Sequence, residues 1–324
     1  MTKHSSKDAL SRRDALKVLG LAGVAAAASP LAGGAVAQGA QPATPAAQAQ
    51  SNGGGFYRTK VGDFTAVVLS DGQAAPGPAF PNWGANPGQQ PTYEAALREN
   101  FIDPARYINN FNPMLVDTGR EKVLIDTGRG GDAGRLLTHL AAAGYRPQDV
   151  TTVFITHGHG DHIGGLTNAN GALVFANAKH FMGEVDFNYW MTQASNASVA
   201  KNLIPHKDKF TLLKPGATIV AGLTTVDSPG HTPGHQSVLV TSGGQSLLHF
   251  GDAAGHYIVS LRFPDSYLGF DMDKPLAVAT RAKLFAQVSA DRTRVVGYHF
   301  PWPGTGYIRK DGAGYEYVPE FFTF

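Results

Sequence analysis

The feature that most constrains this chain is a cluster of potential metal ligands placed directly after a short strand. Thr152–Thr156 is apolar and β-branched, which predicts a buried strand. The next six residues, 157–162, read His-Gly-His-Gly-Asp-His. Two histidines at i and i+2 can hold one ion, and the glycines keep the turn narrow. The pattern predicts a metal site at a strand end; the alternative interpretation is a histidine-rich surface loop.

Three later strand ends carry the same residue types. Ser228–His235 reads SPGHTPGH and follows a strand predicted at 223–226, Phe250-Gly251-Asp252 ends the next apolar run, and Tyr298-His299 ends the last one. Each run places an imidazole or a carboxylate at its end, so all of them can point into one common cleft. These strands, interspersed with helices such as the one predicted over 275–289, indicate two mixed β-sheets packed together and covered by helices.

Composition removes several classes of site. The 324 residues include 12 histidines and no cysteine, which excludes thiolate zinc sites, iron–sulfur clusters and a cysteine nucleophile. Lysine and arginine number 27 and aspartate and glutamate 25, but residues 1–37 hold five of the former and two of the latter. The remainder therefore carries 22 basic and 23 acidic residues, a formal charge of −1. No basic patch remains to argue for a nucleic-acid partner.

Residues 1–37 have the organisation of a bacterial export signal. Ser11–Lys17 reads SRRDALK, an Ala/Gly-rich apolar stretch follows, and Ala35–Ala37 offers a cleavage site. The motif is typical of substrates of the twin-arginine export machinery, which predicts a periplasmic or secreted protein. An uncleaved anchor is the alternative. Residues 38–55 are rich in Ala, Gln, Pro and Gly and predict a disordered linker, which leaves 56–324 as the folded domain.

Together these motifs resemble the metallo-β-lactamase fold superfamily, and within it the methyl parathion hydrolase-like and lactonase-like group. The resemblance also rests on the start YRTKVGDFTAVVLSDG and on the ending GYHFPWPGTGYIRKDGAGYEYVP. It implies an α/β fold, the αββα sandwich of two mixed sheets flanked by helices, with a dinuclear metal site at one edge. Relatives in this group are often dimers, so the resemblance is compatible with a homodimer.

The resemblance implies two sets of ligands with one residue between them. The first set is His157, His159 and His231, the second is Asp161, His162 and His299, and Asp252 bridges both. His235 and Asp126 are expected behind the ligands, although Asp126 is also an ordinary turn former before Thr-Gly. With no soft sulfur ligand, the two divalent ions are expected to be Zn²⁺, with Mn²⁺, Co²⁺ or Fe²⁺ as alternatives.

Such a site predicts a metal-dependent hydrolase. A hydroxide held between the two ions attacks an ester, lactone or organophosphate triester bond, and Asp161 is a candidate for delivering a proton to the leaving group. The substrate is therefore a small molecule. Two alternatives remain at this stage: a single-iron sulfur-redox enzyme of the same fold, and a binding protein without catalytic activity.

Aromatic residues are expected to line the substrate cleft. Trp190, in the predicted helix VDFNYWM, and Tyr257 are the main candidates, and His256 lies next to Tyr257. An aromatic residue taken singly is more often part of ordinary core packing, and His256 is equally compatible with a surface imidazole. Further aromatic candidates are Phe101, Tyr107, Phe111, Tyr189, Phe263, Tyr267 and Phe270.

Overall fold

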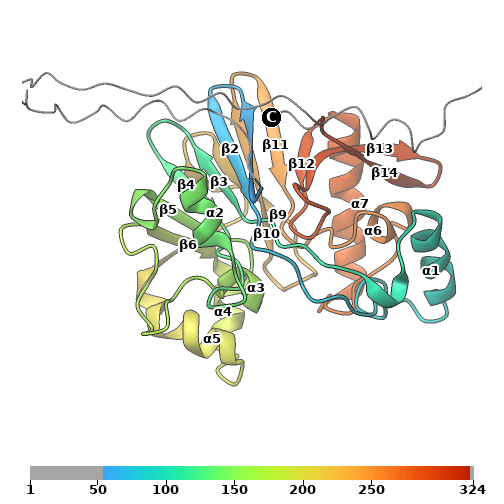
Figure 1. The fold of residues 1–324 in the computed structure, drawn as a ribbon, viewed down its shortest axis with the longest axis horizontal. Helices are drawn as coiled ribbons and strands as arrows, with labels where there is room; N and C mark the ends of the chain where they lie inside the picture. The colour runs from blue at the N-terminus through green and yellow to red at the C-terminus, as the bar shows by residue number, and fades with distance from the viewer. Residues whose placement is uncertain (1–53, 322–324) are drawn as a thin grey trace, which may run out of the picture. The chain divides into compact units, whose positions relative to one another are not determined.

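Two seven-stranded sheets face each other across a shared apolar core (Figure 1). The computed structural model describes residues 54–321, so the expected export signal and all but the end of the expected linker lie outside the described residues. The first sheet has the order β1(Phe56–Val61), β2(Phe64–Leu69), β3(Met114–Asp117), β4(Lys122–Ile125), β5(Thr152–Ile155), β6(Lys179–Gly183), β7(Phe210–Leu213). The second has the order β14(Gly314–Pro319), β13(Thr305–Asp311), β12(Arg294–Val296), β11(Gln245–His249), β10(Gln236–Ser242), β9(Leu223–Asp227), β8(Thr218–Val220).

Both faces of the first sheet are buried, because successive side chains of a strand point to opposite faces. Ala66 and Val68 of β2 belong to the core between the sheets. Val67 and Leu69, the alternate residues, pack against helices instead. The central strands therefore have nearly continuous apolar sequences, which is typical of sheets covered on both sides.

Helices cover the outer face of each sheet. α2(Leu136–Ala142), α3(Gly160–Ile163), α4(Glu184–Met191) and α5(Ala197–Asn202) lie over the first sheet, and α6(Val259–Arg262) and α7(Lys274–Ala290) lie over the second. α1(Gln90–Glu99) packs in a separate apolar cluster that also holds Trp83 and Leu268. Three short 3₁₀ helices complete the described chain: η1(Pro104–Arg106), η2(Pro147–Asp149) and η3(Ile204–Lys209). The predicted sandwich of two mixed sheets flanked by helices is confirmed.

The local predictions differ from the structure in several places. The sequence at about 132–143, followed by Gly144, predicts a helix, but α2 begins only at Leu136. The Asp71 carboxylate accepts hydrogen bonds from the N–H groups of Arg135 and Leu136 and so fixes the start of the helix there. The strands β1, β6, β7 and β8 are not among those expected from the sequence. The hairpin β13–β14 is not among them either, since its residues alternate weakly between buried and exposed. No helix in the described range 54–321 has the length and apolarity needed to cross a bilayer.

The strand directions bring distant segments to one edge of the sandwich. β4 and β5 run parallel, and so do β11 and β12. β9 runs the same way as β11, because β10 pairs antiparallel with both. The segments that follow β5, β9, β11 and β12 carry the predicted metal ligands, so the connections after these strands are the ones that build the site.

Candidate metal centre

The hexapeptide after β5 is held in a tight turn that continues into α3. His157 is fully buried, and His159 is the residue that precedes the first turn of α3, where Asp161 and His162 lie. The position between the two first histidines admits only glycine. A Cβ atom at Gly158 would come within 2.4 Å of the Trp190 ring. The narrow turn is therefore a requirement of packing against α4.

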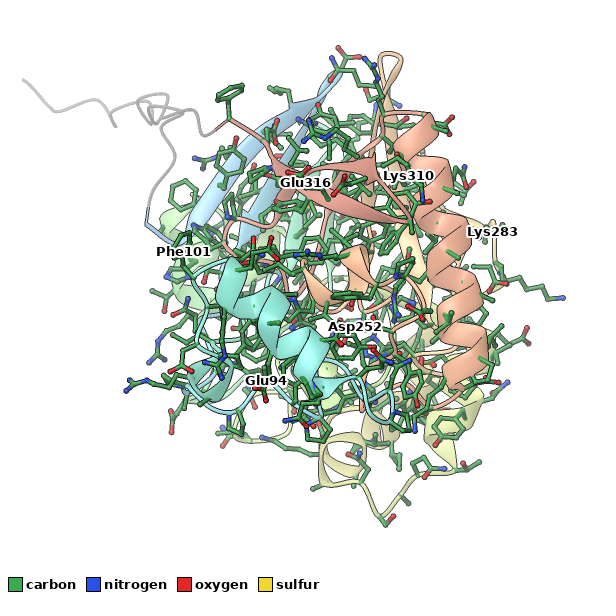
Figure 2. The ribbon with its side chains drawn as sticks, turned by 90° about the vertical axis from the view of Figure 1, so that its right-hand side faces the viewer. Glu94, Phe101, Asp252, Lys283, Lys310 and Glu316 are labelled. Carbon is green, nitrogen blue, oxygen red and sulfur yellow. The ribbon has the colours of Figure 1, made fainter. Side chains whose placement is uncertain are left out.

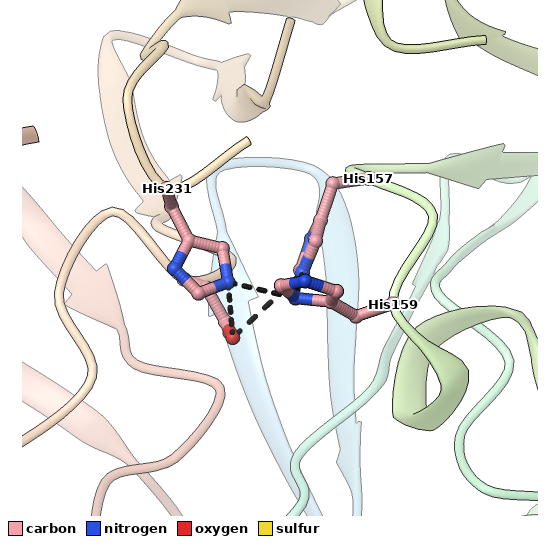
Figure 3. Close-up of side chains that lie close together, drawn as sticks. His157, His159 and His231 are labelled. Atoms are coloured by element: carbon pink, nitrogen blue, oxygen red, sulfur yellow. Dashed lines mark hydrogen bonds and ion pairs between the residues drawn. The ribbon is translucent and has the colours of Figure 1, made fainter. Parts of the chain in front are cut away.

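The structure brings all seven predicted ligands into two adjacent groups. His157, His159, His231 and Asp252 form one group and Asp161, His162 and His299 the other; the candidate ligand atoms of each group lie within 4.8 Å of one another. Figure 3 shows His231 on one side of the first group, facing His157 and His159. The Nδ1 atom of His159 lies 2.9 Å from Nε2 of both His157 and His231.

Asp252 lies between the two groups. Its Oδ2 atom is 3.2 Å from Nε2 of His231 and 3.1 Å from Nε2 of His299, and its Oδ1 atom is 3.3 Å from Nε2 of His162. Each group therefore has at least one histidine nitrogen within 3.3 Å of the Asp252 carboxylate. This is the arrangement that a carboxylate shared by two ions requires.

Two buried polar atoms of the centre are placed to bind a cation rather than to form a hydrogen bond with each other. Nε2 of His162 and Oδ1 of Asp252 are buried and have no hydrogen-bond partner in the described part of the chain, although they lie 3.3 Å apart. Buried polar atoms without partners are rare and costly. Nitrogen and oxygen donors without sulfur suit Zn²⁺, Mn²⁺, Co²⁺ and Fe²⁺. The residues present are thus a fitting site for divalent metal.

The charges of the centre favour metal binding. Burial lowers the pKa of His159 to about 3 and that of His157 well below its usual value, so both rings are neutral. Burial opposes ionisation of Asp252, but His299 and His162 outweigh it and hold the pKa of this carboxyl well below its usual range. Burial likewise opposes a charge on His231, but Asp252 and Asp271 raise the pKa of its imidazole to about 9. The carboxylates thus draw positive charge to the centre, which a proton or a metal ion can supply.

The two residues expected behind the ligands contact them directly. Asp126 accepts hydrogen bonds from the N–H and hydroxyl of Thr156, both at 2.8 Å, and its Oδ2 lies 2.7 Å from Nδ1 of His162. His235 accepts a hydrogen bond at Nε2 from the backbone N–H of Asp252, at 2.9 Å, and its Nδ1 lies 2.8 Å from the Ser228 hydroxyl. Asp126 therefore orients a ligand ring, whereas His235 orients a ligand's backbone.

Two buried carboxylates of the centre were missed by the sequence reasoning. Asp186 accepts hydrogen bonds from Gly158 N–H, Trp190 Nε1–H and Gly234 N–H, and so joins the loops that carry His157 and His231. Its helix also contains Glu184 and Asn188, so no local pattern distinguishes Asp186. Asp271 lies 2.9 Å from Nδ1 of His231 through Oδ1. No local pattern marks it, because it lies in the irregular segment before α7.

Tyr298 is a further contact of the second group that was not predicted. Its ring stacks on His162 with centroids 3.9 Å apart, and its hydroxyl donates a hydrogen bond to the carbonyl oxygen of Asp161 over 2.5 Å. The residue immediately before His299 therefore also fixes the two neighbouring ligands.

The centre opens into a cavity of about 390 Å³ with an aromatic wall. His299 lines this cavity, and the rings of Trp83 and Phe111 meet its ring edge-on, with centroids 5.3 and 5.5 Å away. The lining consists of Trp83, Asn109, Phe111, His159, Gly160, Asp161, His231, Asp252, Leu268, Phe270 and His299. A separate hollow of about 600 Å³ at the start of α2 contains none of the predicted ligands.

The three residues predicted to form the pocket lie elsewhere. Trp190 is 3% exposed and meets His159 edge-on at 5.3 Å, so it supports a ligand from behind. His256 is fully buried and stacks between Tyr107 and Tyr257, a layer behind Trp83. Tyr257 lines a different surface hollow, beside α6. Of the wider aromatic candidates, Phe111 and Phe270 do line the cavity.

Comparisons with known proteins agree with this geometry. The family model described as the metallo-beta-lactamase superfamily matches residues 111–299, more than half of the chain. An N-acyl homoserine lactonase of Bacillus cereus is 26% identical over 185 residues, covering 53% of this chain and 70% of that protein. The lactonase AiiA of Bacillus thuringiensis subsp. kurstaki is 26% identical over 188 residues, with the same shares.

Solved structures extend the likeness over most of the domain. AidC, described as a dizinc quorum-quenching lactonase in complex with a product, matches with a TM-score of 0.76 and 28% identity over 83% of this chain and 99% of that one. The hydrolase AbOPH matches with a TM-score of 0.76 and 27% identity, over 85% and 100%. With a matching fold, site and family model, the chain belongs to the metallo-beta-lactamase superfamily, as a metal-dependent hydrolase.

Proposed function

We propose that this protein hydrolyses lactones, with N-acyl homoserine lactones as the first class of substrate. One observation carries the proposal: the two groups of metal ligands, with Asp252 between them, open into a cavity that the apolar side chains of Trp83, Leu268 and Phe270 also line. A substrate with a polar lactone ring and an apolar acyl chain matches this cavity, because the ring can face the metal ligands while the chain contacts the apolar side chains. The relatives named as N-acyl homoserine lactonases and the dizinc lactonase AidC support this choice.

The two ligand groups are proposed to hold two divalent ions, Zn²⁺ before Mn²⁺, Co²⁺ or Fe²⁺. His157, His159 and His231 belong to one ion, and Asp161, His162 and His299 to the other, with Asp252 shared. When bound, a pair of divalent ions lowers the pKa of water and polarises a carbonyl oxygen. The chain's own residues orient the substrate and move the protons.

Asp161 is the group placed to return a proton to the leaving oxygen of the substrate. Its side chain is 28% exposed and lines the cavity, whereas that of Asp252 is 6% exposed and surrounded by imidazoles. The attacking water loses one proton, and ring opening leaves an alkoxide that needs one. The Asp161 carboxylate can take the first proton and return it to the alkoxide. Asp252 contacts histidines of both ligand groups through its carboxylate, and His235 holds its backbone, so Asp252 keeps the two groups at a fixed separation.

The apolar wall is proposed to bind the acyl chain and to exclude water from it. Trp83 and Phe270 meet edge-on with centroids 5.9 Å apart, and Leu268 lies beside them in the lining. Apolar pockets of this kind bind by area removed from water, roughly 25 cal/mol per Å². The same wall can accept an aryl leaving group, which makes aryl esters and aryl phosphotriesters the second class to test.

The proposal is tested by a rate panel with a metal titration. Metal-free protein is loaded with Zn²⁺, Mn²⁺, Co²⁺ or Fe²⁺ and assayed on N-hexanoyl homoserine lactone, an aryl acetate and an aryl phosphotriester. Lactone turnover that saturates at two ions per chain and disappears in Asp252→Ala supports the proposal. Turnover of the phosphotriester alone, or dioxygen uptake with one iron per chain, would contradict it.

A further inference from the structure

Arg281 is the largest fully buried side chain of the described domain, and it lies on the covered side of α7. Its Nε donates to the carbonyl oxygen of Ala253 at 3.0 Å, Nη1 donates to the carbonyl oxygen of Ser266, and Nη2 donates to Oδ2 of Asp271 at 3.2 Å. Lys283, two residues along the same helix, points outward instead (Figure 2). A guanidinium remains charged even when buried, so this placement needs a reason.

The reason lies in the second oxygen of Asp271. Oδ1 of this carboxylate is 2.9 Å from Nδ1 of His231, so guanidinium, carboxylate and imidazole form a continuous chain. An ionised carboxylate only accepts, so Nδ1 of His231 carries the hydrogen and donates it. The Nε2 atom then faces Asp252 and His159 with its lone pair free for a metal ion.

A second contact of Arg281 reaches the shared carboxylate. Ala253, whose carbonyl oxygen accepts from Nε, directly follows Asp252 in the chain. One side chain of α7 thus contacts the support of His231 and the peptide beside Asp252. Both of these residues belong to the group that contains His157 and His159. No hydrogen bond from Arg281 reaches His162 or His299 in the described structure.

We propose that Arg281 is a positioning residue for the metal site that contains His157 and His159. Arg281 holds Asp271, which orients His231, and it also holds the peptide that follows Asp252. The proposal rests on the dinuclear site of the proposed function, but not on its substrate. It gives α7, which contributes no ligand, a selective role in metal affinity.

The test compares metal binding in Arg281→Met, Asp271→Asn and the double variant. Each protein is stripped with a chelator and titrated with Zn²⁺ against a competing chelator, and bound metal is counted by elemental analysis. Co²⁺-loaded samples report the coordination of each site through their visible spectra. Arg281→Met is expected to lower the affinity for the ion held by His231 by about 10–100-fold, and the affinity for the other ion, which shares only Asp252, by much less.

Two control variants separate positioning from folding. Lys283→Met removes an exposed cation from the same helix, and Phe285→Leu reduces a buried ring that packs against Phe250 at 5.9 Å. Neither is expected to change the affinity of either ion. Because Arg281→Met removes the guanidinium that pairs with the buried Asp271 carboxylate, it lowers the melting temperature of the metal-free protein. The double variant restores part of that loss, since both charges are gone, yet its affinity for the one ion stays low.

The outcomes are distinct. An equal loss of affinity for both ions in Arg281→Met would make Arg281 merely structural and overturn the proposal. Recovery of metal affinity together with stability in the double variant would do the same. Two ions bound with wild-type affinity in Arg281→Met would overturn it as well. A wild-type protein that binds two ions but opens no lactone refutes the proposed substrate alone, and the selective loss in Arg281→Met then still supports the positioning role.

Discussion

Nε2 of His235 accepts a hydrogen bond from the backbone N–H of Asp252 at 2.9 Å, which gives the second histidine of PGHTPGH a task different from that of the first. Burial lowers the pKa of His235 to about 3, so its ring is neutral and Nε2 is free to accept. The first histidine, His231, faces the ligand cluster. The two histidines of this motif therefore have different roles: His231 offers its side chain as a ligand, whereas His235 holds the backbone of Asp252.

His235→Ala is expected to reduce kcat/KM less than His231→Ala does. The former loses one hydrogen bond to a ligand's backbone and costs about 1–3 kcal/mol of stability. The latter removes a metal ligand. Paired measurements of kcat/KM and bound metal check this order, with melting temperature as the control for folding. The reverse order would exchange the roles assigned to the two histidines.

Asp252→Ala is expected to lower kcat/KM by more than about 100-fold. Removing groups that merely support a ligand costs about 10–100-fold in affinity or activity, and Asp252 is itself the carboxylate between both groups. The fold is expected to persist, because the apolar core between the sheets does not include this residue. Circular dichroism and metal analysis accompany the assay. Near-native turnover with two bound ions would refute the assignment.

Asp186 predicts a specific dependence of stability on pH. Burial raises the pKa of this carboxyl to about 6 in the folded protein, against about 4 in an unfolded chain. Between these values the folded state binds more protons, so the stability of the wild type relative to Asp186→Asn falls as pH rises from about 4 to about 6, by about 3 kcal/mol at most. Urea unfolding of the metal-free proteins measures the difference. A difference that is flat or grows with pH would contradict the prediction.

Phe270→Ala is expected to raise KM for long-chain N-acyl homoserine lactones about tenfold while kcat changes little. Phe270 lines the cavity but is 45% exposed, so its loss removes binding area more than core packing. Short-chain lactones are expected to respond less. Phe101→Ala is a matched control, because Phe101 is 99% exposed and lies outside the lining. Equal KM increases in both variants would remove Phe270 from the binding wall.

The export proposal concerns residues 1–37, which lie outside the described residues. Changing Arg12 and Arg13 together to Lys is expected to keep the protein in the cytoplasm at its full length, because the twin-arginine machinery reads that pair. Cell fractionation followed by immunoblotting measures the distribution. Unchanged periplasmic or extracellular protein would refute this route. The enzyme activity of the retained protein serves as the control for folding.

The ligands could be predicted from the sequence because they are local to strand ends. The hexapeptide 157–162 carries four candidate ligands within six consecutive residues, and the remaining ones each follow an apolar run. A strand end fixes the direction of the residues that follow it, so short patterns indicated the candidate ligands and the two mixed sheets. The resemblance to the metallo-β-lactamase superfamily supplied the division of the ligands into two sets. Asp126 and His235 were within reach for the same reason.

The tertiary structure alone decided what supports the ligands and what faces the substrate. Asp271 meets His231 across 40 residues, and Trp83 meets His299 across more than 200. Such pairs depend on how α7 and the long loop before β3 pack on the sandwich, and packing is not periodic in sequence. Trp190 illustrates the limit: its helix was predicted, but only packing turned its ring behind His159 instead of into the cavity.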